Sequence, residues 1–400
     1  MLGGKLSQLT ITAQQQFKRL QKAYPHRLRH LGFVENLSAC LNASRCVVAA
    51  GRIAIEALTQ GVPVVAVGEI SFMGLIDLHN LPAAMASNFG DMGTQYEPGP
   101  IDFSAITTAI MLGLKLPGLD AALIKTVRQK YAIQTVCQQI KSIYRGAMVE
   151  KQHPRHIPIL MYHKVLPQAE QSRHKTYVTC EQFSQHMRFL AKYGFTPITF
   201  KDYFAFRDGD RSLDEFPHKP IILTFDDGYE NNLHYALPIM QRYGFKGVLF
   251  ALGSEIDYNK WDADAGEPRH QLLKMEQLRT IAASGFEIGA HSLTHPHLPT
   301  LPSETADMEI RQSKLRLEQS LQQSVISFAY PYGDYDDRIK ALVKKAGFKC
   351  AVATDSGGLM LEQDHFALFR VNIMPSDHRL QFFKKTSSWY RRYYWRKRQR

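Results

Sequence analysis

Short apolar runs alternate with helix-like segments from residue 158 to residue 352, and this alternation restricts the fold more than any other feature. Regular β–α alternation is typical of a parallel sheet covered by helices. Polar residues follow several of the runs, and barrels carry their functional sites at such strand ends, so we predict a (β/α) barrel, complete or lacking one strand. Strands are expected at 158–163, 194–199, 221–223, 247–252, 286–290, 325–330 and 350–352, helices at 180–193, 231–242, 275–284, 303–322 and 336–346, and an acidic, irregular connection at 203–217.

Two adjacent carboxylates, Asp226 and Asp227, stand just past the apolar run 221–223. Burying a carboxylate without a partner is costly, so two of them at the end of a core strand indicate a site. Gly228 lets the backbone turn directly afterwards, so that one carboxylate can hold a cation while the other handles a proton. The alternative interpretation is an Asp-Gly turn in which Asp227 caps a helix.

Two histidines, His291 and His295, follow the strand-like run 286–290. Their i, i+4 spacing can put both rings on one side of a helical turn. A lone histidine is usually a satisfied polar residue, but two at this spacing after a strand are more often ligands. One Asp and two His, with room left for water, is the composition of an open catalytic site of the Zn²⁺ type.

The two motifs, "TFDDGY" at 224–229 and "HSLTHPHL" at 291–298, resemble in this order those of the polysaccharide deacetylase domain, also called the NodB homology domain or carbohydrate esterase family 4. The resemblance covers roughly residues 157–375. It implies a distorted (β/α)7-type barrel and metal-dependent hydrolysis of N-acetyl groups on an amino sugar of a glycan or glycolipid.

The resemblance also implies roles for the motif residues. Asp227, His291 and His295 would hold a divalent metal, zinc with cobalt or nickel as alternatives, and Asp226 would be the general base. These roles agree with the chemistry, because a bound cation lowers the pKa of water and polarises a carbonyl. A neighbouring ionised carboxylate then accepts the proton of the water.

A third motif, Pro331-Tyr332-Gly333, lies after the expected strand 325–330. In the family, the main chain at the Tyr332 position donates a hydrogen bond to the oxyanion, an interaction that such a reaction needs. Taken alone, the motif is also compatible with an ordinary type II turn. We expect Tyr229 and Pro331, from the same motifs, to contact the substrate.

The sequence departs from the common family pattern at two places. Ala329 stands where an arginine usually orients the catalytic aspartate. Arg370 is the expected replacement from a neighbouring strand, and the alternative is that Arg370 is a surface arginine.

The second departure concerns the general acid, because its usual Leu-x-x-His-Asp context is missing after Asp355. His163, in a "MYHKV" opening that resembles the subset acting on poly-N-acetylglucosamine, is expected in the pocket as acid or substrate positioner, a structural histidine being the alternative.

Residues 1–145 are predicted to form a separate α/β unit with a helix at 13–24, a strand near 31–34, and a strand–helix–strand unit at 46–50, 53–59 and 64–67. The stretch "AAGRIAIEALTQGVPVVAVGE" and "NFGD" resemble the nucleotide-sugar half of a B-type glycosyltransferase. The resemblance implies a partial Rossmann-like domain in which Gly51 and Arg52 meet a diphosphate and Glu56 holds a ribose. Only about fifty residues precede Arg52, so sugar transfer is not expected. Weak nucleotide binding, docking and a stabilising role remain open.

The expected organisation is therefore a glycosyltransferase-like fragment at 1–145, a linker at 146–156, a deacetylase domain at 157–380 and a basic tail at 384–400. The tail carries eight of the +12 net charges and no acid, interleaved with Trp389, Tyr390, Tyr393, Tyr394 and Trp395. Such a tail suits an anionic membrane surface or remains a solvated terminus. No motif supports specific nucleic-acid binding.

The sequence shows no signal peptide, no run long enough for a membrane span and five cysteines without paired spacing. We therefore expect a cytoplasmic protein, with a peripheral position at the inner membrane left open. An N-deacetylase is the leading hypothesis. The alternatives are an O-deacetylase or another amide hydrolase on the same metal site, and a sugar-nucleotide-binding scaffold built on residues 1–145.

Overall fold

The computed structural model of the chain describes residues 10–32, 34–92, 102–152, 157–354 and 356–398. The chain divides into two compact units, residues 1–139 and 140–400, which are considered one at a time.

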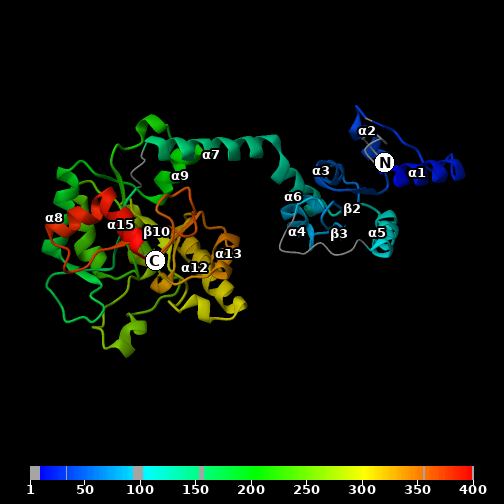
Figure 1. Cartoon of the computed structure of the whole chain (residues 1–400). Coiled ribbons are helices and arrows are strands. Elements are labelled where there is room, and N and C mark those ends of the chain that lie inside the picture. The colour runs from blue at the N-terminus through cyan, green and yellow to red at the C-terminus, as the bar shows by residue number, and fades with distance from the viewer. Residues whose placement is uncertain (1–9, 33, 93–101, 153–156, 355, 399–400) are drawn as a thin grey trace. The chain divides into compact units, whose positions relative to one another are not determined.

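The second unit, which contains the strand labelled β10 in Figure 1, is built on a parallel sheet. The strand order of this sheet is β12-β11-β10-β9-β8-β4-β13. A further short strand, β7, pairs with β8 in the same direction. The strands are β4 (Ile159–Tyr162), β7 (Thr196–Pro197), β8 (Pro220–Phe225), β9 (Val248–Ala251), β10 (Glu287–Ala290), β11 (Ser327–Ala329), β12 (Cys350–Val352) and β13 (Val371–Asn372). The α/β class and the parallel, barrel-type sheet are thus confirmed.

The outer strands β12 and β13 are joined through an irregular segment. Leu368 donates its backbone N–H to Ala351 at 3.0 Å and accepts from Ala353 at 2.9 Å, so this segment runs beside β12. The chain then continues into β13, which pairs with β4. The sheet is therefore curved, and residues after Leu368 reach the strand ends where β8 delivers its carboxylates.

Alternate residues of the strands feed two apolar clusters, as the period of a strand requires. Along β8, Leu223 and Phe225 pack toward the covering helices, whereas Ile222 belongs to the cluster on the other face. Those helices are α8 (Cys180–Lys192), α10 (Leu237–Gln241), α11 (Met275–Ala283), α12 (Ser303–Leu321) and α13 (Asp337–Lys345). A π-helical turn, Asn232–Ala236, precedes α10 within the expected helix 231–242.

Helix α9 (Phe200–Asp208) corrects the prediction of an irregular connection at 203–217. Thr199 and Asp202 form a capping box at its start, and Gly209 ends it in the left-handed conformation with φ 92°. The acids in this segment suggested a loop. However, Phe200 and Phe204 are buried in the cluster on the inner face of the sheet, and their packing decides the conformation.

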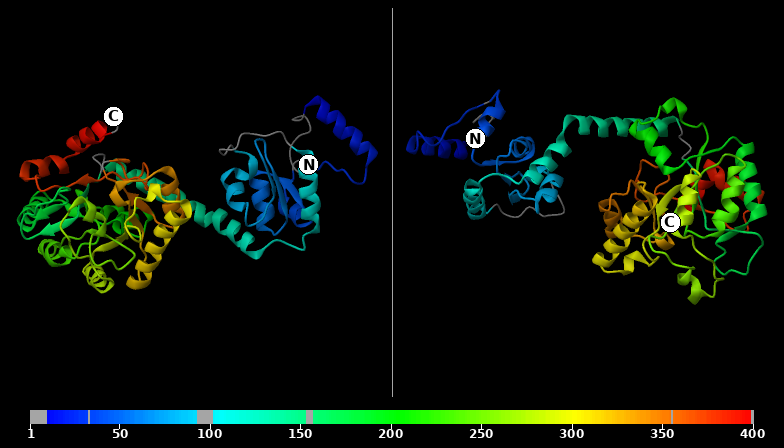
Figure 2. Two further views of the ribbon diagram at one scale, coloured as in Figure 1. Left: turned by 90° about the horizontal axis from the view of Figure 1, so that it is seen from below. Right: turned by 180° about the vertical axis from the view of Figure 1, so that it is seen from behind.

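The first unit holds a small mixed sheet (Figure 2). Strands β1 (Val47–Ala49) and β2 (Val64–Val67) are parallel and connected by α3 (Gly51–Thr59), as expected, but β3 (Phe72–Leu75) runs antiparallel to β2. Its other helices are α1 (Ile11–Ala23), α2 (Leu37–Asn42), α4 (Leu81–Ala86), α5 (Phe103–Lys115) and α6 (Ala121–Tyr131). The strand predicted near 31–34 is wrong, since Leu31, Gly32 and Val34 are not in a strand.

The segment predicted as a linker, 146–156, is helical as far as Gln152, because it continues α7 (Ile133–Gln152). Residues 153–156 lie outside the described residues. Among the helices that the structure describes, none combines the length and the apolarity that a bilayer span needs. All five cysteines are free thiols.

Helix α12 offers a test of the core. Leu317 is fully buried against the sheet, whereas Leu315 on the same helix is 45% exposed. We expect Leu317→Ala to lower the free energy of unfolding by about 2–5 kcal/mol, because it leaves a cavity in the core. Leu315→Ala should change it by roughly 0.5 kcal/mol or less. Urea unfolding followed by circular dichroism measures both, and equal effects would contradict this packing.

Candidate metal centre and active site

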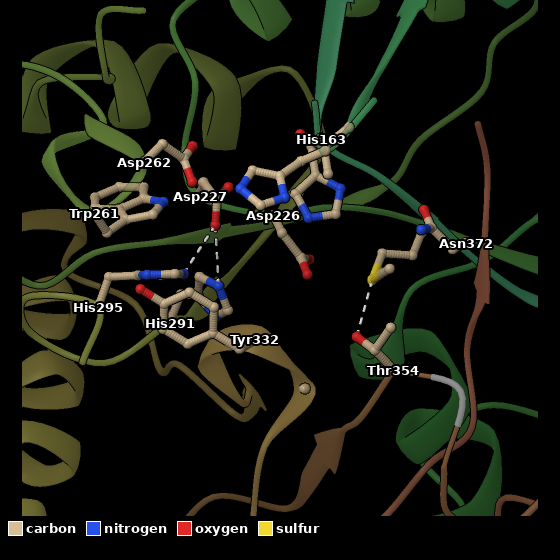
Figure 3. A pocket seen from close by; sticks show the side chains of 14 residues that line it. His163, Asp226, Asp227, Trp261, Asp262, His291, His295, Tyr332, Thr354 and Asn372 are labelled. Atoms are coloured by element: carbon tan, nitrogen blue, oxygen red, sulfur yellow. Dashed lines mark hydrogen bonds and ion pairs between the residues drawn. The ribbon is translucent and has the colours of Figure 1, made fainter. Parts of the chain in front are cut away.

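Strand β8 delivers Asp226 and Asp227 to the end of the sheet, where the backbone turns sharply. Asp226 still follows the ladder, because its N–H donates to the Tyr162 carbonyl at 3.0 Å. Asp227 and Gly228 then adopt left-handed conformations with φ 69° and 68°. This turn breaks the strand alternation and sends the two carboxylates toward different partners (Figure 3).

Asp227 meets both histidines of the second motif. Its Oδ1 lies 3.2 Å from His291 Nε2 and 3.3 Å from His295 Nε2, and all three side chains are buried. His291 Nδ1 donates to the Ala329 carbonyl at 2.8 Å, so its Nε2 is the nitrogen left for a ligand. Burial by itself raises the pKa of Asp227, but its contacts with the His291 and His295 rings outweigh it and hold the pKa well below its ordinary value.

These three residues fit a divalent metal ion. Their donor atoms all lie within 4.8 Å of one another. Donors about 2.0–2.2 Å from a tetrahedral Zn²⁺ ion are roughly 3.3–3.6 Å apart, which is close to the spacing between Asp227 and the two rings. One ionised carboxylate and two imidazoles also leave positions open for water and substrate. A buried Asp-His-His set of this kind is consistent with a divalent metal site.

The histidine motif does not form the helical turn that its spacing suggested. Residues 291–297 are a loop in which Ser292 and His295 have φ values of 62° and 68°. Ser292 Oγ accepts the N–H of His295 at 2.9 Å, which closes the turn and brings His295 back toward His291. Left-handed non-glycine residues are strained, and such strain is typical of sites where the surroundings hold a required geometry.

Glu309 of α12 holds this loop and was not anticipated. Its buried carboxylate accepts the N–H groups of Leu293 and Thr294 at 2.9 Å each and the Thr294 hydroxyl at 2.8 Å. The sequence does contain a signal for it. Glu309 sits beside Ile310 on the helix stripe that also carries Ala306, Ser313 and Leu317, all of them buried, where a lone carboxylate requires a partner.

Asp226 is paired with Arg370, the residue expected to replace the arginine missing at Ala329. The guanidinium is fully buried and binds the carboxylate with two hydrogen bonds, of 2.6 Å to Oδ1 and 2.7 Å to Oδ2. It also donates to Thr224 Oγ1 at 3.1 Å and to the Ala353 carbonyl at 3.0 Å. Burial by itself raises the pKa of Asp226, but the Arg370 charge outweighs it and holds the pKa below its ordinary value.

His163 lies in the same cavity as the two carboxylates (Figure 3). Its backbone carbonyl accepts from Asn232 Nδ2 at 2.8 Å, which fixes the chain just past β4. Its ring Nδ1 is buried and has no hydrogen-bond partner among the described residues. A buried ring nitrogen without a protein partner is suited to a ligand, so a structural role alone does not account for this histidine.

Tyr332 and Gly333 form another wall of the cavity. Tyr332 has a φ of 60°, and its ring stacks on His297 at 3.7 Å between centroids. Burial, with Asp262 and Asp227 nearby, raises the pKa of the Tyr332 hydroxyl to about 12, so the hydroxyl stays protonated. Tyr229 and Pro331 are buried and do not line the cavity, so the geometry does not support the substrate contact expected for them.

The cavity has a volume of about 260 Å³ and includes several residues that the motifs did not indicate. Trp261 stacks on His295 at 4.2 Å between ring centroids and shields one side of the histidine pair. The others are Asp262, His174, Thr176, Thr354 and Asn372. They come from segments far apart in the sequence, and nothing in their local sequence indicates that these segments meet.

In the first unit, the geometry offers little to a phosphate at α3. A Cβ placed on Gly51 would lie only 2.8 Å from the Asp91 carboxylate, so an acid already stands at this helix start. Arg52 and Glu56, the other residues expected to bind a nucleotide sugar, form an ion pair with each other.

The comparisons with known proteins agree with this site. Residues 214–351 match the family model described as "Polysaccharide deacetylase", so the C-terminal part of the chain carries a polysaccharide deacetylase domain. The matched stretch includes Asp226, Asp227, His291 and His295. It begins after His163 and ends before Arg370.

Two curated relatives and one solved structure illustrate the similarity. The chain is 28% identical over 247 residues to "Putative polysaccharide deacetylase YxkH" of Bacillus subtilis, covering 62% of this chain and 81% of the relative. It is 22% identical over 208 residues to "Poly-beta-1,6-N-acetyl-D-glucosamine N-deacetylase" of Staphylococcus aureus, covering 49% and 67%. A de-N-acetylase of Aggregatibacter actinomycetemcomitans shares the fold, with a TM-score of 0.50 and 16% identity over 57% of this chain and 99% of that chain.

We predict that mutations of Asp226 and Arg370 have strongly coupled effects on the free energy of unfolding. We expect Arg370→Met to lower the free energy of unfolding by about 3–5 kcal/mol, because it leaves Asp226 buried without a cation. Asp226→Asn combined with Arg370→Met should cost much less than the sum of the single changes. Urea unfolding with a chelator present measures this double-mutant cycle. The exposed pair Arg211 and Glu215 is the control and should couple by less than about 1 kcal/mol. Similar coupling in both pairs would contradict the buried ion pair.

The Glu309 contacts predict an effect on metal affinity. We expect Glu309→Ala to weaken Zn²⁺ binding about 10–100-fold, because the loop that carries His295 loses its support. Isothermal titration calorimetry with Zn²⁺ measures the dissociation constant. Glu304→Ala, an exposed change on the same helix, is the matched control and should leave it unchanged. Equal affinity in the two variants would show that Glu309 does not hold the ligand loop.

Proposed function

We propose that the chain is a metal-dependent N-deacetylase that removes acetyl groups from amino sugars of a polysaccharide or glycolipid. One observation carries the proposal: two adjacent buried carboxylates are divided between a histidine pair and a buried arginine, and the carboxylates and histidines open onto one cavity. The Staphylococcus aureus relative is named as an N-deacetylase of poly-beta-1,6-N-acetyl-D-glucosamine, which supports the substrate class.

In this proposal Asp227, His291 and His295 hold the metal, for which zinc suits the donor set best and cobalt or nickel are alternatives. A divalent cation bound there would supply Lewis-acid chemistry, acidifying water and polarising the amide carbonyl of the acetamido group. The hydrogen bond from His291 to the Ala329 carbonyl keeps the proton on Nδ1 and so presents Nε2 as the ligand atom.

Asp226 is the general base. Arg370 keeps it ionised and holds both of its oxygens, so the carboxylate has a defined orientation toward the cavity. Asp226 accepts a proton from the attacking water, whose oxygen bonds to the acetyl carbon. The oxyanion formed on the acetyl group then needs a donor, and the main-chain N–H of Tyr332 is the group proposed for it.

His163 is proposed as the proton donor to the leaving nitrogen. Its ring lies in the same cavity as both carboxylates. As the bond between the acetyl carbon and the sugar nitrogen breaks, that nitrogen takes a proton from the imidazole and leaves as an amine. The acetyl group leaves as acetic acid, which loses its proton to solvent and becomes acetate. Asp226 passes its proton to solvent and His163 takes one back, so the site returns to its starting state. If another group donates the proton, His163 would instead position the sugar.

The proposal predicts the outcome of an acetate-release assay on N-acetylglucosamine oligomers. Chelator should abolish release, and added Zn²⁺ should restore it. Asp226→Asn and His295→Ala should each lower the rate at least about 100-fold, because a base or a ligand is lost. His234→Ala is the matched control, since His234 is exposed and does not line the cavity, and should keep most of the activity. Unchanged release in Asp226→Asn would overturn the mechanism, and faster release from O-acetylated sugars would overturn the proposed bond class.

A further inference from the structure

The C-terminal basic segment forms two helices that are attached to the barrel, α14 (Arg379–Thr386) and α15 (Ser388–Arg398). Phe382 is fully buried and stacks on His186 at 4.0 Å between ring centroids. The Trp395 indole donates to the Gly357 carbonyl at 2.7 Å, and the Tyr394 ring lies 6.3 Å from that of Phe369. The helices therefore have one side that packs on the barrel and another that faces outward (Figure 2).

The exposed positions of these two helices combine large apolar side chains with cations. Four apolar residues are strongly exposed: Leu380 (72%), Phe383 (48%), Trp389 (59%) and Tyr393 (59%). The exposed cations on the same helices include Lys384, Arg392, Arg396 and Lys397, and residues 379–398 contain no acid. We call these eight residues the basic-aromatic surface. A side kept only for solubility would not expose this much apolar area.

We propose that the basic-aromatic surface binds an anionic lipid bilayer. Lysines and arginines near a membrane are attracted by anionic headgroups. Trp, Phe and Leu side chains of such helices enter the boundary between headgroups and acyl chains. Nucleic acid fits less well, because Leu380, the most exposed of the apolar residues, has no ring on which a base can stack.

The helices that carry this surface contact segments that line or neighbour the cavity. Gly357, which accepts the hydrogen bond from Trp395, follows the cavity residue Thr354 by three positions. Lys385 donates to the backbone carbonyl of Asn372, another cavity residue, at 2.8 Å. A bilayer bound at this surface would thus lie close to segments that line the cavity. An amino sugar linked to a lipid of that bilayer could then reach the cavity. This last step rests on the proposed function, whereas bilayer binding itself does not.

Vesicle co-sedimentation of the full chain tests the proposal. Vesicles of phosphatidylcholine alone should bind weakly, and those that also contain phosphatidylglycerol should bind strongly. Added salt should weaken this binding, because it screens exposed charges. Arg396→Glu with Lys397→Glu should weaken it about tenfold or more, since each cation contributes roughly a fivefold change. Lys344→Glu with Lys345→Glu, two exposed neighbours at the end of α13, is the matched control and should bind like the wild type.

Trp389→Ala tests the apolar part of the surface and should also weaken binding to the anionic vesicles. Circular dichroism and the midpoint of urea unfolding show that each variant is folded. Three results would overturn the proposal. The chain could bind both kinds of vesicle equally, both double variants could lose the same amount of vesicle binding, or the chain could bind a polynucleotide but not vesicles. A chain that binds anionic vesicles but releases no acetate would instead contradict the proposed function alone.

Discussion

The buried ion pair between Arg370 and Asp226 is the interaction on which the site most depends. It joins the segment before β13 to the end of β8, two strands that are separated in the sheet by β4. A carboxylate this deeply buried would lose its charge without a cation, and a guanidinium without a carboxylate would be still more costly. The position of β13 relative to β8 therefore depends on Asp226 being ionised. Either partner without the other would destabilise the fold.

Strained backbone conformations at the site direct the two neighbouring carboxylates to different partners. Of the eight non-glycine residues with positive φ in the described part of the chain, four lie at the site: Asp227, Ser292, His295 and Tyr332. Each such conformation costs on the order of 1–3 kcal/mol and must be held by its surroundings. The supports come from packed helices and strands, with Glu309 of α12 as the clearest example. The rigid core thus maintains a geometry that short local sequences would not adopt alone.

Much of this could be predicted from sequence, and the limits have physical causes. The β–α alternation predicted the parallel sheet, and Arg370 was expected beside Asp226 because Ala329 stands where the resembled family has the arginine that orients this aspartate. The helical turn expected for His291 and His295 was wrong, because i, i+4 spacing does not reveal that Ser292 and Glu309 would hold a loop. Helix α9 was missed because its aromatic residues act through tertiary packing, which the charges of the segment conceal. The Trp261 loop and Asn372 meet only in the folded barrel.

The position of Arg370 has a consequence for how this site can change over time. Ala329 is fully buried beside Phe250 and Val352, and the Arg370 guanidinium lies 5.6 Å from the Phe250 ring. An arginine at position 329 would therefore compete with Arg370 for one small space, while loss of Arg370 alone would leave Asp226 without a cation. A change from an arginine at position 370 to one at position 329 would therefore pass through a sequence with both arginines or with neither. A lineage that carries one arrangement is thus held in it by epistasis, although both would serve the same carboxylate.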